Sequence, residues 1–290
     1  MKIALIITGQ LRTYKLCSTI IKNTIIDKYD TDVFLSIKKS NKLQSIYLND
    51  TKDTSDDDIK NAIDIYSPKD VYICDDYDSI YETIHTNRDF IENRLLLEQY
   101  YMIEQGYKLL IKYIKSNNVK YDAIIRVRFD QYIWSESSNI ISSFLTTISG
   151  GNKIMYYNPE EIENINNISK SLIIDMDIPL SNEIYVYGEG GLHSEYKWVN
   201  DQFWLHSMEL IDIMVNFYKD IPSIINEVIL HNFHPSNCPY FELVFYVFLK
   251  RNNIDIKRSK IIGEFCREYN NFKGLYSTVD ESVTGTNLRW

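Results

Sequence analysis

The sequence has few cysteines, no excess of positive charge and no long apolar run, and each absence excludes a class of protein. Its four cysteines include no CxxC pair, so the chain is no disulfide scaffold and its thiols fit a reducing, cytosol-like compartment. A formal net charge of -9 argues against a nucleic-acid partner, because nucleic acid is bound by a basic face. No segment approaches the roughly 20 apolar residues of a membrane span, so we expect no integral membrane segment and a cytoplasmic location.

Glycine-rich phosphate loops are also absent. The first candidate strand is followed by one glycine, Gly9, in the segment TGQLRTY. This segment matches neither GxGxxG nor a P-loop, so it supports no dinucleotide-binding protein, kinase or nucleotidyltransferase. The chain has 290 residues, 44% of them hydrophobic, with no repeat and no low-complexity linker. We therefore expect one continuous domain over residues 1–290.

The apolar residues predict alternating strands and helices. Residues 3–7 form an apolar run of buried-strand length, helical spacing follows over 11–26, and a second strand is predicted over 32–37. This order predicts a parallel sheet covered by helices. Further strands are predicted at 70–74, 153–157, 184–187 and 254–256, further helices at 93–117 and 242–250, and a loop entering a helix at 199–217.

A row of charged residues lies in YDAIIRVRFDQYIW, at positions 121–134. Arg126, Arg128 and Asp130 alternate there, and in a strand such residues point to one face. They need partners or a ligand, because burying an unpaired charge is unfavourable. Two guanidiniums suit a free or metal-bridged diphosphate, whose oxygens they match in a bidentate way. A structural ion pair at a strand end explains the same pattern, and both interpretations stay open.

The order of the motifs resembles a known family. The segments IALIITGQLRTY, DVFLSI, RVRFD and NDQFWLHSMELID are together similar to GT-A-like glycosyltransferases found in bacterial surface-polysaccharide clusters and giant viruses. The resemblance implies an α/β fold with a mixed, mainly parallel sheet flanked by helices, as in nucleotide-diphospho-sugar transferases. Residues 1–134 would form the nucleotide-binding half and residues 135–290 the acceptor-side half. A viral protein would act in the host cytoplasm.

The resemblance also assigns the donor site. The loop after the first strand would grip the nucleotide through Thr8, Gly9, Gln10 and Arg12, with Arg12 reaching a phosphate. From the residues alone, the glycine permits close backbone approach and the next helix begins where a phosphate could bind. An ordinary strand-to-helix turn with a solvated arginine is the alternative.

The expected metal site departs from the family pattern. GT-A enzymes end a central strand in Asp-x-Asp, whereas this chain has Arg128, Phe129 and Asp130, so only the second acid matches. Asp130 would hold Mn or Mg together with diphosphate oxygens and water. Arg126 and Arg128 could supply part of that positive charge. His234 is a further candidate for a metal or diphosphate contact, although a structural histidine is the alternative there.

Two acids are candidates for the general base that activates an acceptor hydroxyl. Asp201 is the first choice by resemblance, since its region lies near sugar and acceptor, and Glu242 is the second because it lies among apolar residues. Either acid could instead stabilise a helix start. Aromatic residues could form a sugar-stacking wall or belong to the core: Tyr185, Tyr187, Trp198, Phe203 and Trp204.

The sequence therefore predicts a glycosyltransferase of hexosyl or deoxyhexosyl type. It would move sugar from a nucleotide-sugar donor to a glycan or glycoconjugate acceptor, with a divalent metal assisting. One base serves direct displacement, which favours inversion. The alternative is a non-catalytic protein that binds nucleotide or glycan, or serves as a scaffold, on a degenerate transferase fold; the missing first acid favours it.

Overall fold

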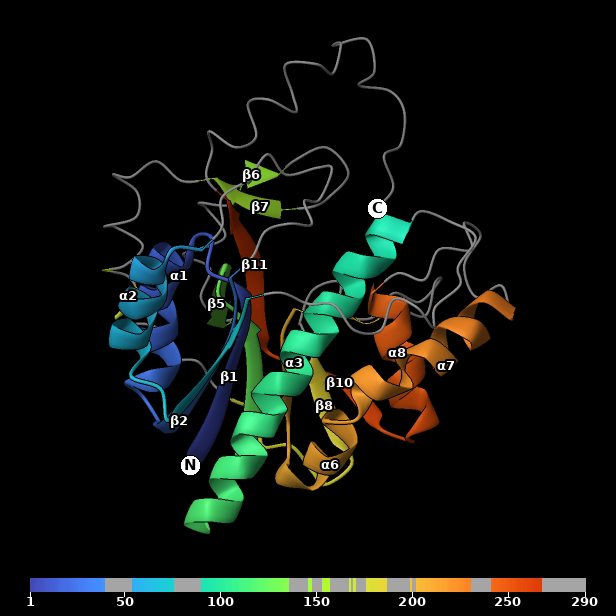
Figure 1. Ribbon diagram of the computed structural model, residues 1–290. Coiled ribbons are helices and arrows are strands. Elements are labelled where there is room, and N and C mark those ends of the chain that lie inside the picture. The colour runs from blue at the N-terminus through green and yellow to red at the C-terminus, as the bar shows by residue number, and fades with distance from the viewer. Residues whose placement is uncertain are drawn as a thin grey trace, which may run out of the picture.

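The computed structural model describes residues 1–39, 54–75, 90–135, 146–147, 153–156, 167, 169–170, 176–186, 199, 202–230 and 241–267. These residues form an α/β fold in which helices cover both faces of a central sheet (Figure 1). The predicted α/β class, with a mixed and mainly parallel sheet, is confirmed at this level. No helix among the described residues is long and apolar enough to cross a bilayer.

The central sheet has seven strands in the order β10-β8-β9-β4-β1-β2-β3. Strands β3, β2, β1 and β4 are parallel, β9 is antiparallel to both of its neighbours, and β10 is parallel to β8. The strands are β1 (Lys2–Gln10), β2 (Asp30–Lys38), β3 (Asp70–Cys74), β4 (Ala123–Arg128), β8 (Glu183–Val186), β9 (Trp204–His206) and β10 (Asp255–Arg258). Strands from both predicted halves of the chain, residues 1–134 and 135–290, therefore lie in one sheet.

A smaller sheet lies beyond the carboxyl ends of the central parallel strands (Figure 1). Its order is β5-β11-β7-β6, with β5 antiparallel to β11. The strands are β5 (Gln131–Ser135), β6 (Thr146–Thr147), β7 (Lys153–Tyr156) and β11 (Ile261–Arg267). Because β5 follows β4 after only two residues, this sheet begins directly at the end of β4.

Strand β1 separates two hydrophobic clusters, one on each face of the sheet. Ala4 and Ile6 pack toward one cluster, whereas Ile3, Leu5 and Ile7 pack toward the other. The first cluster lies under α3 (Phe90–Asn117), α6 (Ile211–Met214), α7 (Phe217–Leu230) and α8 (Phe241–Arg251). The second lies under α1 (Tyr14–Ile21) and α2 (Asp56–Tyr66). Burial on both faces explains why β1 reads as a continuous apolar run.

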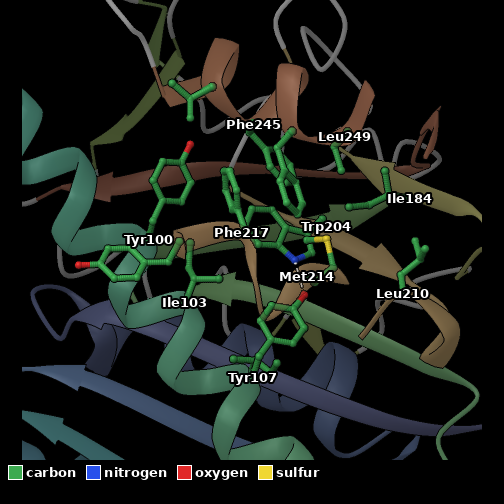
Figure 2. Close-up of a cluster of buried hydrophobic side chains, with 14 of the residues drawn as sticks. Tyr100, Ile103, Tyr107, Ile184, Trp204, Leu210, Met214, Phe217, Phe245 and Leu249 are labelled. Carbon is green, nitrogen blue, oxygen red and sulfur yellow. Dashed lines mark hydrogen bonds between the residues drawn. The ribbon is translucent and has the colours of Figure 1, made fainter. Parts of the chain in front are cut away.

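The first cluster is rich in aromatic rings (Figure 2). The Trp204 ring of β9 lies 4.5 Å from the Phe245 ring of α8, and its indole N–H donates a 2.8 Å hydrogen bond to the Tyr107 hydroxyl of α3. Tyr107 donates in turn to Nε2 of His206, 2.6 Å away, since the His206 Nδ1–H donates to the Ser207 carbonyl. Pairing of these buried polar atoms lets a hydrogen-bonded chain lie inside an apolar core.

Most predicted elements are confirmed. The strands predicted at 3–7, 32–37, 70–74, 153–157, 184–187 and 254–256 match β1, β2, β3, β7, β8 and β10, and the helices predicted at 93–117 and 242–250 match α3 and α8. The helix predicted over 11–26 begins at Tyr14, and its last turn, Lys22–Ile26, is a π-helix. Helix α2 ends at Tyr66, two residues before Pro68. A proline disfavours helical backbone at the residue that precedes it, so a helix is expected to end at this point.

Two predictions were wrong. The charged row does not lie on one strand, because β4 ends at Arg128 and Asp130 lies in the turn to β5. The loop predicted at the start of 199–217 contains β9, which is only three residues long and pairs with β4 and β8. So short a strand shows no periodicity of its own, and its neighbours decide its conformation.

Candidate functional site

Charged residues gather where the parallel strands β1 and β4 end. The chain passes from β1 to β2 on one side, while β4 pairs on the other side of β1. The strand order reverses between these neighbours, and in open α/β sheets ligands bind outside the carboxyl ends of the strands at such a point. Thr8 of β1 is opposite Arg128 of β4, so the polar side chains converge at this edge.

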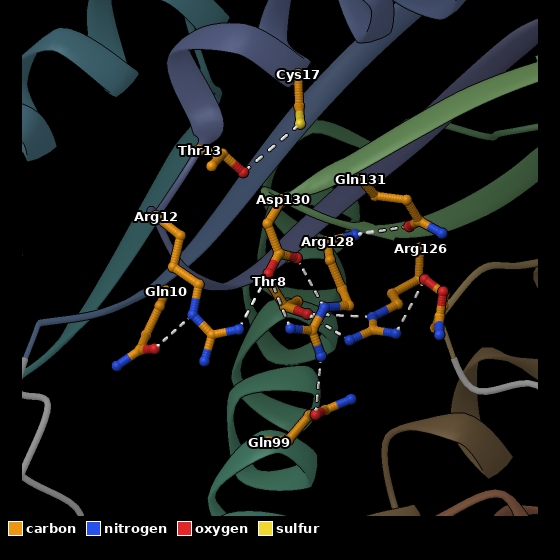
Figure 3. Close-up of polar contacts among 11 residues, drawn as sticks. Thr8, Gln10, Arg12, Thr13, Cys17, Gln99, Arg126, Arg128, Asp130 and Gln131 are labelled. Carbon is orange, nitrogen blue, oxygen red and sulfur yellow. Dashed lines mark hydrogen bonds and ion pairs between the residues drawn. The ribbon is translucent and has the colours of Figure 1, made fainter. Parts of the chain in front are cut away.

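The Asp130 carboxylate joins two arginines from segments that are far apart in the sequence (Figure 3). Arg128 donates from Nε to Oδ1 at 2.9 Å and from its terminal nitrogen to Oδ2 at 3.1 Å. Arg12 donates to Oδ2 at 3.1 Å. Asp130 is 1% exposed, so both carboxylate oxygens are bound to guanidinium groups inside the protein. The structural ion pair considered from the sequence is therefore present.

Each of these arginines has a second partner on its own side. Gln10 accepts a 2.9 Å bond from Arg12 Nε, and Gln99 of α3 accepts a 3.1 Å bond from Arg128. The arginine side chains keep 20% and 17% of their surface exposed. The two glutamines therefore hold the guanidiniums in place, and each arginine side chain still reaches solvent at the sheet edge.

Arg126 lies deeper, on the same face of β4 as Arg128. It is fully buried, donates to the Thr8 hydroxyl at 3.1 and 3.0 Å and to the Gln202 carbonyl at 3.3 Å, and its guanidinium lies 4.7 Å from the centre of the Trp204 ring. Arg126 and Trp204 are opposite each other across β4 and β9. This arginine adds positive charge beneath the edge, whereas Arg12 and Arg128 are the ones that reach solvent.

A buried ion pair adjoins the cluster. Lys38 at the end of β2 is paired with Glu98 of α3, and both are less than a tenth exposed. Burial lowers the Lys38 pKa, the Glu98 carboxylate opposes that shift, and the positive charge of Arg12 lowers the pKa further. Lys38 pairs with Gln10 in the sheet register, so the ion pair borders the loop that carries Arg12.

Local backbone geometry places Arg12 in the site. Gly9 has a φ of 115° and Arg12 a φ of 37°, so both are in the left-handed region, where only glycine is unstrained. Gly9 lies near the end of β1 and Arg12 in the turn from β1 to α1. At the end of β4, the Arg128 backbone N–H donates a 3.3 Å bond to the side chain of Gln131, the first residue of β5, and this bond holds the turn that presents Asp130.

The donor set around Asp130 does not fit a divalent cation. Mg and Mn need several oxygen ligands, whereas this carboxylate accepts hydrogen bonds from guanidinium N–H groups, whose positive charge would repel a cation. Among the residues that the structure describes, no three His, Cys, Asp or Glu side chains are grouped to hold a metal. The cluster instead sets two guanidiniums on one carboxylate, with the guanidinium of Arg126 on the neighbouring Thr8, and such a group of arginines favours an anion.

The other predicted residues are only partly placed. Asp201 and His234 lie outside the described residues. Glu242 lies in the first turn of α8, is partly buried, and its carbonyl accepts a 3.2 Å bond from the Val199 N–H. Helix α8 precedes β10, which is parallel to β8, so the helix starts at the same edge of the sheet as the arginines.

The aromatic wall is not formed by the residues that can be placed. Phe203 and Trp204 are fully buried and belong to opposite clusters, so they are core residues. Tyr185 is partly buried and donates to Glu183 at 3.1 Å, while Tyr187 and Trp198 lie outside the described residues.

Sequence reasoning missed the partners on α3 and β2. Gln99 and Glu98 lie on one turn of a long helix that was predicted only by its apolar spacing, and Lys38 directly follows a predicted strand. A glutamate after three leucines is a signal that could have marked the buried pair, because buried acids are rare unless paired.

The fold and the cluster define an α/β protein with a cationic site at the switch point of its sheet. The family described as Domain of unknown function (DUF7796) matches residues 1–158, more than half of the 290 residues, and the chain belongs to this family. No curated protein matches the chain. The matched region contains every arginine of the cluster and its partners on β1, β2, α3 and β5, whereas α8 with Glu242 lies outside it.

Proposed function

We propose that the protein is a glycosyltransferase that moves a sugar from a nucleotide-diphosphate donor to a glycan acceptor. The observation that carries the proposal is the position of the arginine cluster at the carboxyl edge between β1 and β4, where α/β sheets bind nucleotides. The GT-A-like assignment belongs to the same proposal. The parallel order β3-β2-β1-β4, continued by antiparallel β9, supports it.

Sugar transfer needs stabilisation of a departing nucleoside diphosphate, which gains negative charge as the glycosidic bond breaks. Fixed cations aimed at that charge lower the barrier. Arg12 and Arg128 fit this role because they reach solvent, one from the turn after β1 and the other from the end of β4, and are held by Gln10 and Gln99. Their forked N–H groups match phosphate oxygens.

The acceptor hydroxyl has to lose a proton during transfer. Glu242 is the candidate base that the structure describes, since it starts α8 at the same edge of the sheet. Val199 and Gln202 connect the two regions: Val199 binds the Glu242 backbone, and Gln202 binds Arg126. Asp201 remains the other candidate from the sequence.

A non-catalytic nucleotide- or glycan-binding protein is the second candidate. The observation that favours it is the residue at the place of the first acid in the Asp-x-Asp pattern of GT-A enzymes. This residue is Arg128, and it is paired with Asp130. Such a protein would bind the same nucleotides without consuming them.

A ligand panel followed by a turnover assay separates the two candidates. Thermal unfolding is measured with nucleoside diphosphates and nucleotide sugars, with Mn or with EDTA; a ligand at 100 times its Kd stabilises the folded state by about 2.7 kcal/mol. Release of nucleoside diphosphate is then measured with glycan acceptors. A transferase loses release in Glu242→Gln while keeping donor binding. Binding without release for every donor and acceptor favours the non-catalytic protein, and no binding at all overturns both.

A further inference from the structure

Asp130, which the resemblance to GT-A enzymes makes the metal-binding acid, lies in an environment that does not suit a cation. Asp130 accepts three hydrogen bonds from two guanidiniums at 2.9–3.1 Å, and it is 1% exposed. A cation bound to it would compete with these donors for the same two oxygens. It would also lie beside two permanent positive charges, because arginine stays protonated.

The two guanidiniums need a counter-charge of their own. Arg12, in the turn after β1, and Arg128, at the end of β4, both approach Oδ2 of Asp130 at 3.1 Å, so without the carboxylate two like charges would face each other. Lys38 and Arg126 add positive charge nearby, and Glu98 balances the lysine. Among the residues that the structure describes at this edge, two guanidiniums face one carboxylate, and an anion at the exposed side of the arginines would add negative charge to balance them.

We infer that the donor diphosphate binds directly to Arg12 and Arg128 without a divalent cation, and that Asp130 is the internal counter-ion that keeps the two guanidiniums together. This inference rests on the proposed function. It replaces the expected metal by two arginines, each fixed by a glutamine, at a position where the backbone of Arg12 has a φ of 37°. Strained backbone of this kind is found where the surrounding structure holds a functional side chain in place.

Calorimetric titration tests the inference with simple probes. Inorganic pyrophosphate and the diphosphates of adenosine, uridine, guanosine and cytidine are titrated into the full chain, once in EDTA and once in Mn. We expect at least one of these anions to bind in EDTA, with an affinity that Mn does not increase. Binding should weaken as salt is raised, because the contacts are charge-dependent.

The variants distinguish an arginine site from a metal site. Arg12→Gln and Arg128→Gln should each weaken binding in EDTA by about 10- to 100-fold, the usual loss for a hydrogen bond to a charged group. Arg12→Lys and Arg128→Lys keep the charge without the fork and should lie between. Asp130→Asn loses the counter-charge between the two guanidiniums, so the free protein should be less stable. Its binding in EDTA should weaken by less than in the arginine→Gln variants and should still not depend on Mn, because the arginines that contact the anion remain. At a metal site the same change would instead remove binding that requires Mn.

Two matched controls guard against effects of folding. Arg251→Gln removes an arginine that pairs with Glu227 on the α7–α8 surface, and it should leave binding unchanged. Asp32→Asn removes a buried carboxylate paired with Lys2 and Lys69 near the start of β2. It should lower the melting temperature and leave binding unchanged.

The outcomes separate this inference from the proposed function. Binding that requires Mn and is lost in Asp130→Asn overturns the inference and leaves the transferase proposal standing. Metal-free binding on the arginines with no sugar transfer supports the inference and contradicts the transferase. Absence of binding under both conditions overturns the anion site.

Discussion

Gly106 of α3 lies directly against Ile6 of β1: a Cβ at position 106 would be 2.5 Å from Ile6 Cγ2 and 3.4 Å from Thr8 Cγ2. A glycine inside a helix is usually unfavourable by about 1 kcal/mol. Here it allows the helix to approach the strand closely, and this approach brings Glu98 and Gln99 of the same helix to their partners, Lys38 and Arg128.

Gly106→Ala should therefore destabilise the protein, although alanine is the better helix former. We expect a loss of about 1–3 kcal/mol in the free energy of unfolding, because the methyl group forces α3 away from β1. Urea unfolding followed by circular dichroism measures it. Ser116→Ala, at an exposed position of the same helix, is the control and should change stability little. Equal stability of the wild type and Gly106→Ala would show that the strand can yield.

Arg126→Lys should destabilise the protein, because position 126 requires the shape of the guanidinium group as well as its charge. A lysine cannot reproduce the two bonds to Thr8, the bond to Gln202 and the stacking on Trp204 together. We expect a loss of about 2–4 kcal/mol in urea unfolding. The matched change Arg251→Lys keeps the charge beside Glu227 but loses the forked contacts of a partly exposed arginine, and it should lower stability by less than about 1 kcal/mol. Similar losses in both variants would contradict a special role for position 126.

Removing one partner of the Lys38–Glu98 pair should destabilise the protein more than replacing both partners. Glu98→Ala leaves the buried lysine without its partner and should lower the unfolding free energy by about 3–5 kcal/mol. The double variant Lys38→Met with Glu98→Leu should recover most of this loss, since apolar side chains of similar volume replace a buried ion pair well. Chemical unfolding of the wild type, Lys38→Met, Glu98→Leu and the double variant gives the coupling between the two sites. A double variant no more stable than Glu98→Ala would argue against the pair.

Glu98→Ala should also change how the free energy of unfolding depends on pH. Burial lowers the Lys38 pKa below its unfolded value of 10.5, so above the folded pKa the unfolded chain binds more protons and stability rises with pH. Removing Glu98 removes an influence that raises this pKa. The rise should therefore begin at lower pH in Glu98→Ala than in the wild type. Parallel pH profiles of the two proteins would contradict this assignment.

His206 should contribute to the loss of stability in acid. Burial lowers its pKa from 6.5 to about 4, so between these values the unfolded chain takes up a proton that the native protein does not. Stability is complete above the unfolded pKa and falls as the pH falls toward 4, by about 3 kcal/mol in total. His206→Gln lacks this titration. The difference in unfolding free energy between variant and wild type should shrink as the pH is lowered through this range, and a constant difference would contradict it.

The sequence determined most of the elements. Apolar runs and helical spacing are local properties of the chain, so β1, β3 and α3 could be predicted from neighbouring residues alone. Alternation also placed Arg126 and Arg128 on one face of β4, and Gly9, after the apolar run 3–7, indicated a special backbone conformation.

Only the tertiary structure decided how these elements meet. Arg12 and Asp130 are 118 positions apart, and Lys38 and Glu98 are 60 apart, so no local pattern records their pairing. Strand β9 exists because β4 and β8 offer it hydrogen bonds. Propensity and periodicity act over a few residues, whereas strand order, buried ion pairs and the convergence of two arginines on one carboxylate arise from packing the whole chain around the sheet.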